Sequence, residues 1–368
     1  MTVAATRPAW AEVDLTAIRA NAASLARVCS PAELCAVVKA DGYGHGAVAV
    51  ARAAIEGGAS RLAVAVVEEA LELREAGIGA PLLVLSDPPA AACVAAVNAG
   101  IAVTVSSAST IDAVAAAGKA AVHLKIDTGM HRTGCDPSEA PGLAAKVGER
   151  GLELEGVWTH LAVADDSDED SVTKSQLDRF DEAVTAVTEV ARPQLLHVAN
   201  SAGAIHHPES RYDLARCGIA LYGYAPSIER DLPSGLVLQP ALSLKAEVTS
   251  VRDVPAGDGV SYGWVARRTE PRRVATIPLG YADGVPRSLG EDGGEVLIRG
   301  QRCPLAGRVT MDQFMVECDY DVVVGDEVVL LGTQGSERIT ADDWGELTGT
   351  ISYEILSRIG PRVPRRYF

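Results

Sequence analysis

The segment VVKADGYGHGA, residues 37–47, places one lysine where an apolar run meets three glycines. Burial of an amine disfavours its ammonium form, so the pKa of Lys39 is expected to fall. A neutral amine can form a Schiff base with an aldehyde cofactor, for which pyridoxal 5′-phosphate (PLP) is the obvious candidate. The alternative is an ordinary lysine at the end of a strand, and Lys39 alone does not decide between the two.

A PLP site also needs groups that hold a phosphate. Ser201, in the segment HVANSAG, is expected to begin a helix, where unpaired N–H groups and the helix dipole favour an anion. The backbone of Gly218 and Ile219 is expected to add N–H groups beside it. A plain helix cap is the alternative interpretation of HVANSAG.

The elements that must position these residues follow from the hydrophobic pattern. Short apolar or β-branched runs alternate with helix-like stretches over the first two thirds of the chain. Eight strands, each followed by a helix, predict an α/β fold with a (β/α)8 TIM-type barrel, and a doubly wound sheet is the competing arrangement. The expected strands are 34–38, 62–67, 81–85, 101–105, 121–126, 154–160, 194–199 and 217–221.

Reactive side chains of such barrels gather at the carboxyl ends of the strands, because the loops there share one face. Lys39 follows the first expected strand and Arg132 follows the fifth. His160 ends the sixth, and Asn200 and Ser201 follow the seventh. We therefore expect these residues to converge on one site.

After about Leu236 the pattern changes to short strand-like runs separated by Gly, Asp and Pro, which predicts a mainly β C-terminal domain. The expected domains are 1–235 and 236–368, with the boundary in the turn-rich segment 226–235. The acidic run 165–171 is expected to be a solvated loop.

Composition narrows the classes of partner. The chain has 368 residues, with 33 Lys+Arg against 49 Asp+Glu and a formal charge of −16, which argues against nucleic acid or an anionic membrane. No apolar run would span a bilayer, and the N-terminus lacks the pattern of a signal peptide. Seven dispersed cysteines without CxxC spacing indicate reduced thiols in a cytoplasmic protein and no metal site.

Beyond these patterns, nine further segments stand out, in order along the chain: AVVKADGYGHGA, LKIDTGMHRTG, WTHLA, HVANSAG, RCGIALYG, VSYG, IPLGYADG, RVTMDQ and ISYEILSRIGPRVPR. Through these motifs the sequence resembles the bacterial alanine racemases over nearly its whole length. The resemblance implies a barrel followed by a β domain, and PLP-dependent interconversion of L- and D-alanine, the latter for peptidoglycan. It also implies a homodimer whose subunits share active sites.

The resemblance assigns the two catalytic bases. Lys39 would carry PLP and exchange a proton on one face of the substrate Cα, and Tyr262, in VSYG, would act on the other face from the partner subunit. Inverting a stereocentre requires removal of a proton from one side and delivery to the opposite side, which two flanking bases achieve. A tyrosine of ordinary pKa, about 10, is a poor base at neutral pH, so nearby cations must lower that pKa. A packed strand aromatic is the alternative for Tyr262.

The resemblance also assigns the cofactor contacts. Arg216 would face the pyridine nitrogen, where many PLP enzymes place an aspartate, and His160 would hold Arg216 or pack against the ring. The phosphate would be bound by the side chains of Tyr43, Ser201 and Tyr353 and the backbone of Gly218 and Ile219, with Asn200 in support.

Substrate contacts follow in the same way. Arg132 would meet the substrate carboxylate, and the Met311 backbone N–H, beside Asp312, would complete that site from the other subunit. Lys125 near Arg132 would set two cations together, a conflict that family members commonly relieve by carbamylating the lysine. Two residues depart from the common pattern, since His131 stands where glycine is frequent and Thr310 where cysteine is common.

Three other functions remain to be compared. A racemase for serine or a basic amino acid differs only in pocket size. A decarboxylase on the same two-domain plan would place an acid at the pyridine nitrogen, where Arg216 is expected. A non-catalytic PLP-holding protein would resemble the barrel alone and would not need Tyr262.

Overall fold

The computed structural model describes residues 7–368, and they form two compact units. The barrel unit comprises residues 16–42 and 47–240, and the β unit comprises the chain up to Leu15, residues 43–46 and residues 241–368. The two units are therefore interleaved in the sequence, and the expected division into domains 1–235 and 236–368 stays a prediction. Residues 1–6, part of the segment expected to lack a signal peptide, lie outside the described residues.

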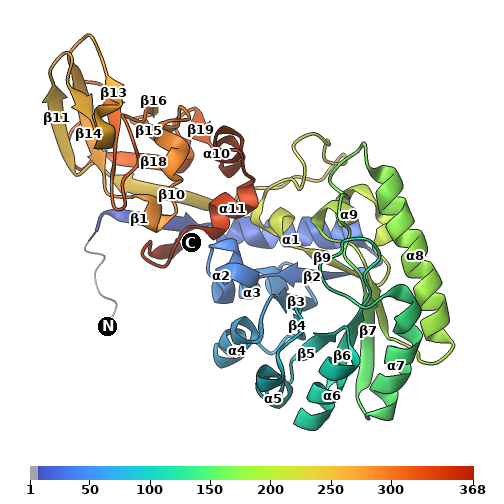
Figure 1. Ribbon diagram of the computed structural model, residues 1–368. Helices are drawn as coiled ribbons and strands as arrows, with labels where there is room; N and C mark the ends of the chain where they lie inside the picture. The colour runs from blue at the N-terminus through green and yellow to red at the C-terminus, as the bar shows by residue number, and fades with distance from the viewer. Residues whose placement is uncertain (1–6) are drawn as a thin grey trace. The chain divides into compact units, whose positions relative to one another are not determined.

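The barrel unit is built on eight parallel strands, as the alternating pattern predicts. Their order is β8-β7-β6-β5-β4-β3-β2-β9, and Figure 1 shows helices α4 to α7 outside them. Hydrogen bonds from Asp213 N–H to the Leu196 carbonyl and from Arg216 N–H to the Ala199 carbonyl, 3.0 Å each, join the two end strands. The competing doubly wound sheet is thereby excluded. The strands are β2 (Glu33–Val37), β3 (Arg61–Val64), β4 (Leu82–Val84), β5 (Ala102–Val105), β6 (Ala121–Lys125), β7 (Glu153–Trp158), β8 (Leu195–His197) and β9 (Leu214–Cys217).

Helices connect these strands, and their buried residues are mostly alanine and branched aliphatic side chains. They are α1 (Leu15–Cys29), α2 (Lys39–Tyr43), α3 (Ala47–Glu56), α4 (Val67–Glu75), α5 (Ala90–Asn98), α6 (Ala108–Ala117), α7 (Ala140–Glu149), α8 (Asp170–Thr188) and α9 (Ser201–His206), with 3₁₀ turns η1 (Pro137–Glu139), η2 (Pro208–Ser210) and η3 (Ile219–Tyr222).

Three details of the expected elements are corrected. The eighth strand ends at Cys217, and residues expected to continue it form η3 instead, because Gly218 has a φ/ψ of −104°/−93° that breaks the extended backbone. The strand expected at 154–160 ends at Trp158, so His160 lies two residues beyond it. The acidic run is not all loop, since α8 begins at Asp170.

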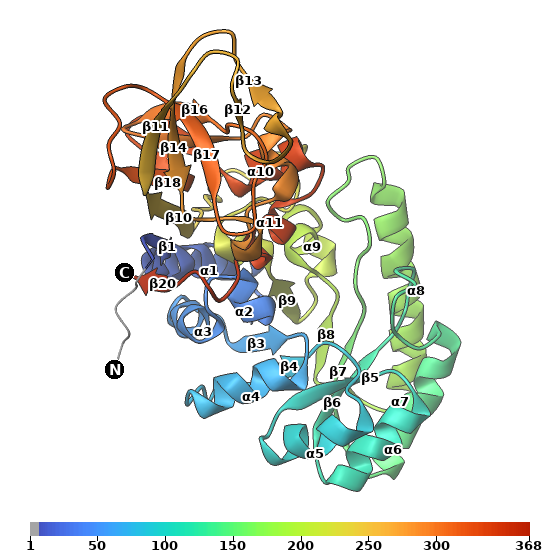
Figure 2. The ribbon, with the colours of Figure 1, turned by 60° about the vertical axis from the view of Figure 1, so that its left-hand side comes forward.

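The β unit contains three antiparallel or mixed sheets (Figure 2). The largest has the order β16-β15-β18-β10-β1-β20, with β19 paired to β18. Its members are β1 (Ala9–Val13), β10 (Leu242–Glu247), β15 (Glu295–Ile298), β16 (Gln301–Pro304), β18 (Glu327–Gln334), β19 (Glu337–Ile339) and β20 (Arg365–Tyr367). The first strand, β1, pairs antiparallel with β10 and parallel with β20. Within residues 7–368, no helix combines the length and apolarity that crossing a bilayer requires.

The other elements of the β unit carry the loops discussed below. They are β11 (Ser250–Val254), β14 (Arg272–Ile277) and β17 (Phe314–Cys318) in one sheet, β12 (Gly259–Val260) and β13 (Ala266–Arg267) in another, the turns η4 (Tyr262–Trp264), η5 (Tyr281–Asp283) and η6 (Arg287–Gly290), and the helices α10 (Ala341–Thr348) and α11 (Ser352–Ser357).

Asp283 is a buried anion that ties the N-terminal strand segment to the rest of the β unit. Arg7 donates to both of its carboxylate oxygens at 2.8 and 2.9 Å, and Gly280 N–H donates at 3.0 Å. The Asp283 side chain has 0% exposure. We expect Asp283→Ala to lower the free energy of unfolding by about 3–5 kcal/mol, because Arg7 and the Gly280 N–H would lose their acceptor. Urea unfolding measures this, with Asp253→Ala, an exposed ion-pair variant on β11, as control. Equal urea midpoints of unfolding for Asp283→Ala and Asp253→Ala would contradict the stabilising role assigned to Asp283.

Candidate active site

Four cations surround His160 at the carboxyl ends of the barrel strands. Burial, and then the charges of Arg216, Arg132, Lys125 and Lys39, hold the pKa of His160 well below its usual value. The imidazole is therefore neutral in a strongly positive environment, which suits an anionic ligand. Five residues that the sequence predicts as neighbours are brought together here within one unit.

Lys39 lies two residues beyond the end of β2, where burial and then the charge of Arg132 lower its pKa. Glu69, near the start of α4, fixes this loop by accepting from Ala40 N–H at 2.6 Å and from Ala65 N–H at 2.7 Å. The backbone then turns left-handed at four successive residues, 40–43, with φ between +50° and +59°. A run of this kind is costly for L-residues outside glycine, and such costs concentrate at functional sites.

Lys125 is the last residue of β6 and is only 4% exposed. Its Nζ donates to Thr133 Oγ1 at 2.5 Å and lies 4.5 Å from the centroid of the Trp158 ring. Burial, followed by the charges of Arg132 and Arg216, lowers its pKa to about 8. Unlike Lys125, Arg132 lies on an exposed loop.

Arg216, in β9, is a buried guanidinium held by neutral acceptors. Its Nη2 donates to the carbonyls of Thr159 and Val198 at 2.9 Å each and lies 3.4 Å from His160 Nδ1. Its Nη1 donates to His197 Nδ1 at 2.9 Å. Burial lowers the pKa of Arg216 to about 10, so it remains charged at neutral pH.

Four of the predicted phosphate residues, Asn200, Ser201, Gly218 and Ile219, lie at two neighbouring turns of the barrel unit. Asn200 caps α9 by accepting from Gly203 N–H at 2.9 Å, and Ser201 is the first residue of that helix. Ser201 Oγ accepts from Gly218 N–H at 2.9 Å and from Ala220 N–H at 3.5 Å. The Ser201 hydroxyl and the first turn of η3, which includes Ile219, therefore lie together.

In the β unit, Tyr262 begins η4 and has 74% exposure. Ser261, at φ +65°, donates from Oγ to the Arg308 carbonyl at 2.7 Å, which ties this turn to the loop that carries Met311. Tyr281 and Ala282 N–H groups donate to the carbonyls of Thr310 and Met311 at 3.0 and 3.1 Å. Three motifs distant in sequence are thus joined in one surface of the β unit.

Tyr43 and Tyr353 also belong to the β unit, and their rings lie 6.2 Å apart at 51°. Tyr43 is buried, and that burial raises the pKa of its hydroxyl. Tyr353 lies in α11 and is half-buried.

Comparison with known proteins decides the family. Residues 13–226 match the model of the alanine racemase N-terminal domain, and residues 241–367 match that of the alanine racemase C-terminal domain. The chain belongs to the alanine racemase family. It is accordingly an isomerase, and both family domains are present.

Individual alanine racemases resemble the chain over almost its full length. That of Symbiobacterium thermophilum is 46% identical over 370 residues, covering 98% of this chain and 97% of the relative. A crystal structure of alanine racemase from Streptomyces lavendulae has a TM-score of 0.92 at 41% identity, covering 98% and 97% of the two chains. The Bacillus anthracis alanine racemase with bound L-Ala-P has a TM-score of 0.93 at 41% identity, covering 98% and 95%.

Several residues of the site received no role from the sequence. Trp158 stacks on His197 with ring centroids 5.6 Å apart and also lies 4.6 Å below the Arg216 guanidinium. A signal for His197 was present in the sequence, because this residue stands in HVANSAG within the predicted strand 194–199. Glu69 had none, because helix periodicity alone does not reveal an interaction with a preceding loop.

Proposed function

We propose that this protein is a cytoplasmic, PLP-dependent alanine racemase that interconverts L- and D-alanine and supplies D-alanine for peptidoglycan. The observation that carries the proposal is the pairing of a low-pKa lysine with a buried arginine, not an acid, in one cationic cluster. Membership of the alanine racemase family supports the same activity.

The donor set fits PLP, an aldehyde that carries a phosphate. Lys39 would bind the aldehyde carbon, and the phosphate would be held by Ser201, the Gly218 and Ile219 backbone, Tyr43 and Tyr353, with Asn200 supporting that turn. When bound, PLP supplies an electron sink for the pair left when the substrate Cα loses its proton.

Arg216 favours racemisation over competing PLP reactions. A guanidinium can donate to the pyridine nitrogen but cannot accept its proton, so Arg216 would keep that nitrogen neutral. His160, itself neutral, would steady Arg216 beside the ring. An amino-acid decarboxylase of this architecture is expected to need an acid at this position, whereas here an arginine stands there, hydrogen-bonded to carbonyls and imidazoles.

Two residues would exchange the Cα proton, Lys39 on one face and Tyr262 on the other. We propose that Tyr262 comes from the second subunit of a homodimer. Tyr262, Trp264 and Met311 are all more than half exposed, a concentration of large apolar side chains on joined loops that a second copy would cover. Arg132 and the Met311 N–H would then bind the substrate carboxylate.

We propose that Lys125 is carbamylated, because CO2 reacts with a neutral amine. A pKa of about 8 means that the neutral fraction of Lys125 is appreciable at pH 7–8 and grows as the pH rises. The resulting carbamate is an anion, so Arg132 would face a negative group that orients its guanidinium and not a second cation. Mass spectrometry under non-denaturing conditions should show one added CO2, absent from Lys125→Arg and retained in Lys146→Arg. An unmodified amine in both the mass and a density map would contradict this.

Assay of the purified protein tests the whole proposal. We expect a yellow protein that converts L-alanine to D-alanine, as followed by chiral chromatography. It should act at least about tenfold less well on L-serine, whose side chain adds a hydroxyl, and on L-lysine, whose side chain is longer by several non-hydrogen atoms. A preference of the protein for serine or lysine would mean that alanine is not its main substrate. Bound PLP without any turnover would indicate a cofactor-holding protein instead.

A further inference from the structure

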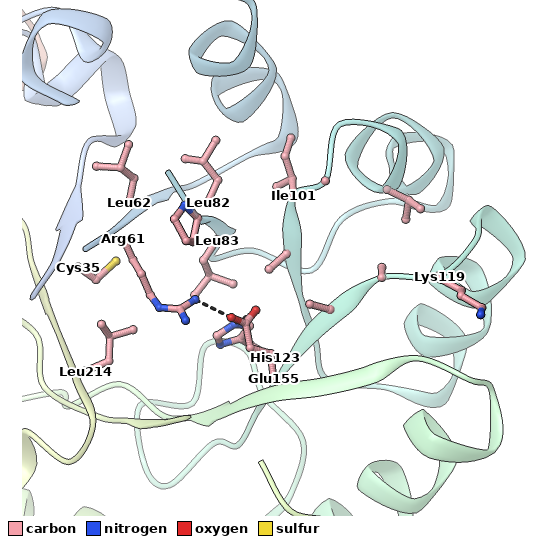
Figure 3. A pocket seen from close by; sticks show the side chains of 16 residues that line it. Cys35, Arg61, Leu62, Leu82, Leu83, Ile101, Lys119, His123, Glu155 and Leu214 are labelled. Atoms are coloured by element: carbon pink, nitrogen blue, oxygen red, sulfur yellow. Dashed lines mark hydrogen bonds and ion pairs between the residues drawn. The ribbon is translucent and has the colours of Figure 1, made fainter. Parts of the chain in front are cut away.

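A second polar region lies at the opposite, amino-terminal ends of the barrel strands. A cavity of about 260 Å³ is lined there by the first residues of β3, β4, β5, β6 and β9, together with side chains from β2 and β7. Figure 3 shows Arg61 and Glu155 pointing toward one another across this cavity, with the His123 ring beside Glu155. Arg61 Nη1 donates to Glu155 Oε1 at 2.5 Å.

A continuous chain of hydrogen bonds joins this ion pair to Arg216. Glu155 Oε2 lies 3.2 Å from His123 Nε2, and His123 Nδ1 lies 2.8 Å from His197 Nε2. His197 Nδ1 lies 2.9 Å from Arg216 Nη1. Both histidines are buried, and burial lowers the pKa of each, which leaves two neutral imidazoles between the charged ends.

The charged ends dictate the direction of every bond in the chain. Arg216 can only donate, so His197 Nδ1 must accept and His197 must carry its proton on Nε2. His123 Nδ1 then accepts, and His123 carries its proton on Nε2. The His123 Nε2–H group donates to Glu155. The His123 hydrogen bond helps lower the pKa of Glu155 to about 2, so Glu155 is an ionised carboxylate that can only accept. The two ends therefore demand the same pair of tautomers.

The backbone is built for this contact. Pairing between β6 and β7 shifts register so that His123 lies opposite Gly156 and Glu155 is the extra residue of a bulge. A bulge redirects side chains next to functional sites. A Cβ at residue 156 would overlap His123 Nδ1, so glycine is required for the ring to take its place.

We infer that Glu155, held by Arg61, is a positioning residue that fixes the tautomers of His123 and His197 so that a lone pair faces Arg216. Nothing in this chain of bonds depends on a bound cofactor. Only its effect on turnover rests on the proposed function.

Glu155→Gln tests the assignment by offering one acceptor where two are needed. Arg61, being charged, should capture the amide oxygen, which leaves the amide NH2 facing His123 Nε2. His123 and then His197 must move their protons to Nδ1, and His197 would oppose Arg216 donor to donor. We expect ¹⁵N NMR of histidine-labelled apoprotein to show the Nε2–H tautomer of His197 falling from nearly all molecules to a minority. Asparagine variants of the two histidines would assign the signals.

The double variant Arg61→Met/Glu155→Gln frees the amide to present its oxygen to His123, so we expect the native tautomers to return. Arg61→Met alone and Glu153→Gln, an exposed carboxylate on the same strand, should keep them. Native tautomers in Glu155→Gln, altered ones in Arg61→Met, or no rescue in the double variant would each overturn the inference. In the holoenzyme, kcat should fall about tenfold or more in Glu155→Gln with little change in KM, and recover in the double variant. A tautomer shift without any racemase activity in the native protein would refute the proposed function and leave the inference standing.

Discussion

Lys39→Ala is expected to lose alanine racemisation by about 10⁴-fold or more, since removing a covalent catalytic group costs effects of this order. The same variant should lose the visible absorbance of the cofactor bound through the lysine. The physical reason is that Lys39, by the proposed function, would combine two tasks, covalent attachment and proton exchange, which no other amine in the cluster is placed to assume. Lys125, the other lysine of that cluster, is engaged by Thr133.

Chiral chromatography of alanine and absorbance spectra of the purified variant measure both losses. Lys146→Ala is a matched control, because Lys146 belongs to the barrel unit and pairs with Asp112 on the outer helices at 2.8 Å. The control should keep absorbance and activity. Racemase activity within tenfold of native in Lys39→Ala would contradict the assigned role.

Tyr262→Phe is expected to lose about 10²–10⁴-fold in kcat, the usual contribution of a positioned acid or base, and to keep the bound cofactor. It removes only a hydroxyl from a side chain that is 74% exposed in a single chain, so folding should be unaffected. Tyr320→Phe, another exposed tyrosine of the β unit, serves as control. A protein that only holds PLP would keep both its cofactor and its function in Tyr262→Phe.

Mixing the two inactive variants tests whether Tyr262 acts across a dimer. Dimers of Lys39→Ala with Tyr262→Phe would contain one site with both changes and one site with neither. Random reassociation of equal amounts should therefore restore about a quarter of native activity in a twofold-symmetric dimer. No recovery, despite subunit exchange shown by a tagged copy, would place both bases on one chain.

The sequence predicted the parts of the barrel unit that periodicity and strand ends control. The apolar run before Lys39 marks a buried strand, and the placement of Lys39, Arg132 and His160 at the ends of separate strands was sufficient to expect one shared site. Their assigned roles remain predictions that depend on the resemblance, because residue spacing does not specify a ligand.

Local departures from regular geometry were not predictable in this way. The bulge at Glu155 breaks the alternation by which successive side chains of a strand point to opposite faces of the sheet. No residue type in that segment signals the bulge. The 3₁₀ turn after β9 uses apolar residues that equally suit a strand. The left-handed turn at residues 40–43 includes alanine and aspartate, and local propensity alone would not place them there. Long-range strand pairing was also missed, since β1 pairs with β10 and β20 and not with its neighbours in the barrel.

That pairing has a consequence for synthesis on the ribosome. Residues 9–13 are translated more than 350 residues before one of their partner strands, 365–367. All eight barrel strands have been translated by residue 217, so the barrel unit can fold while β1 still waits with an unpaired edge. Nascent chains stalled shortly before residue 365 should therefore leave one edge of β1, the edge that later pairs with β20, open to proteases and chaperones until β20 is available.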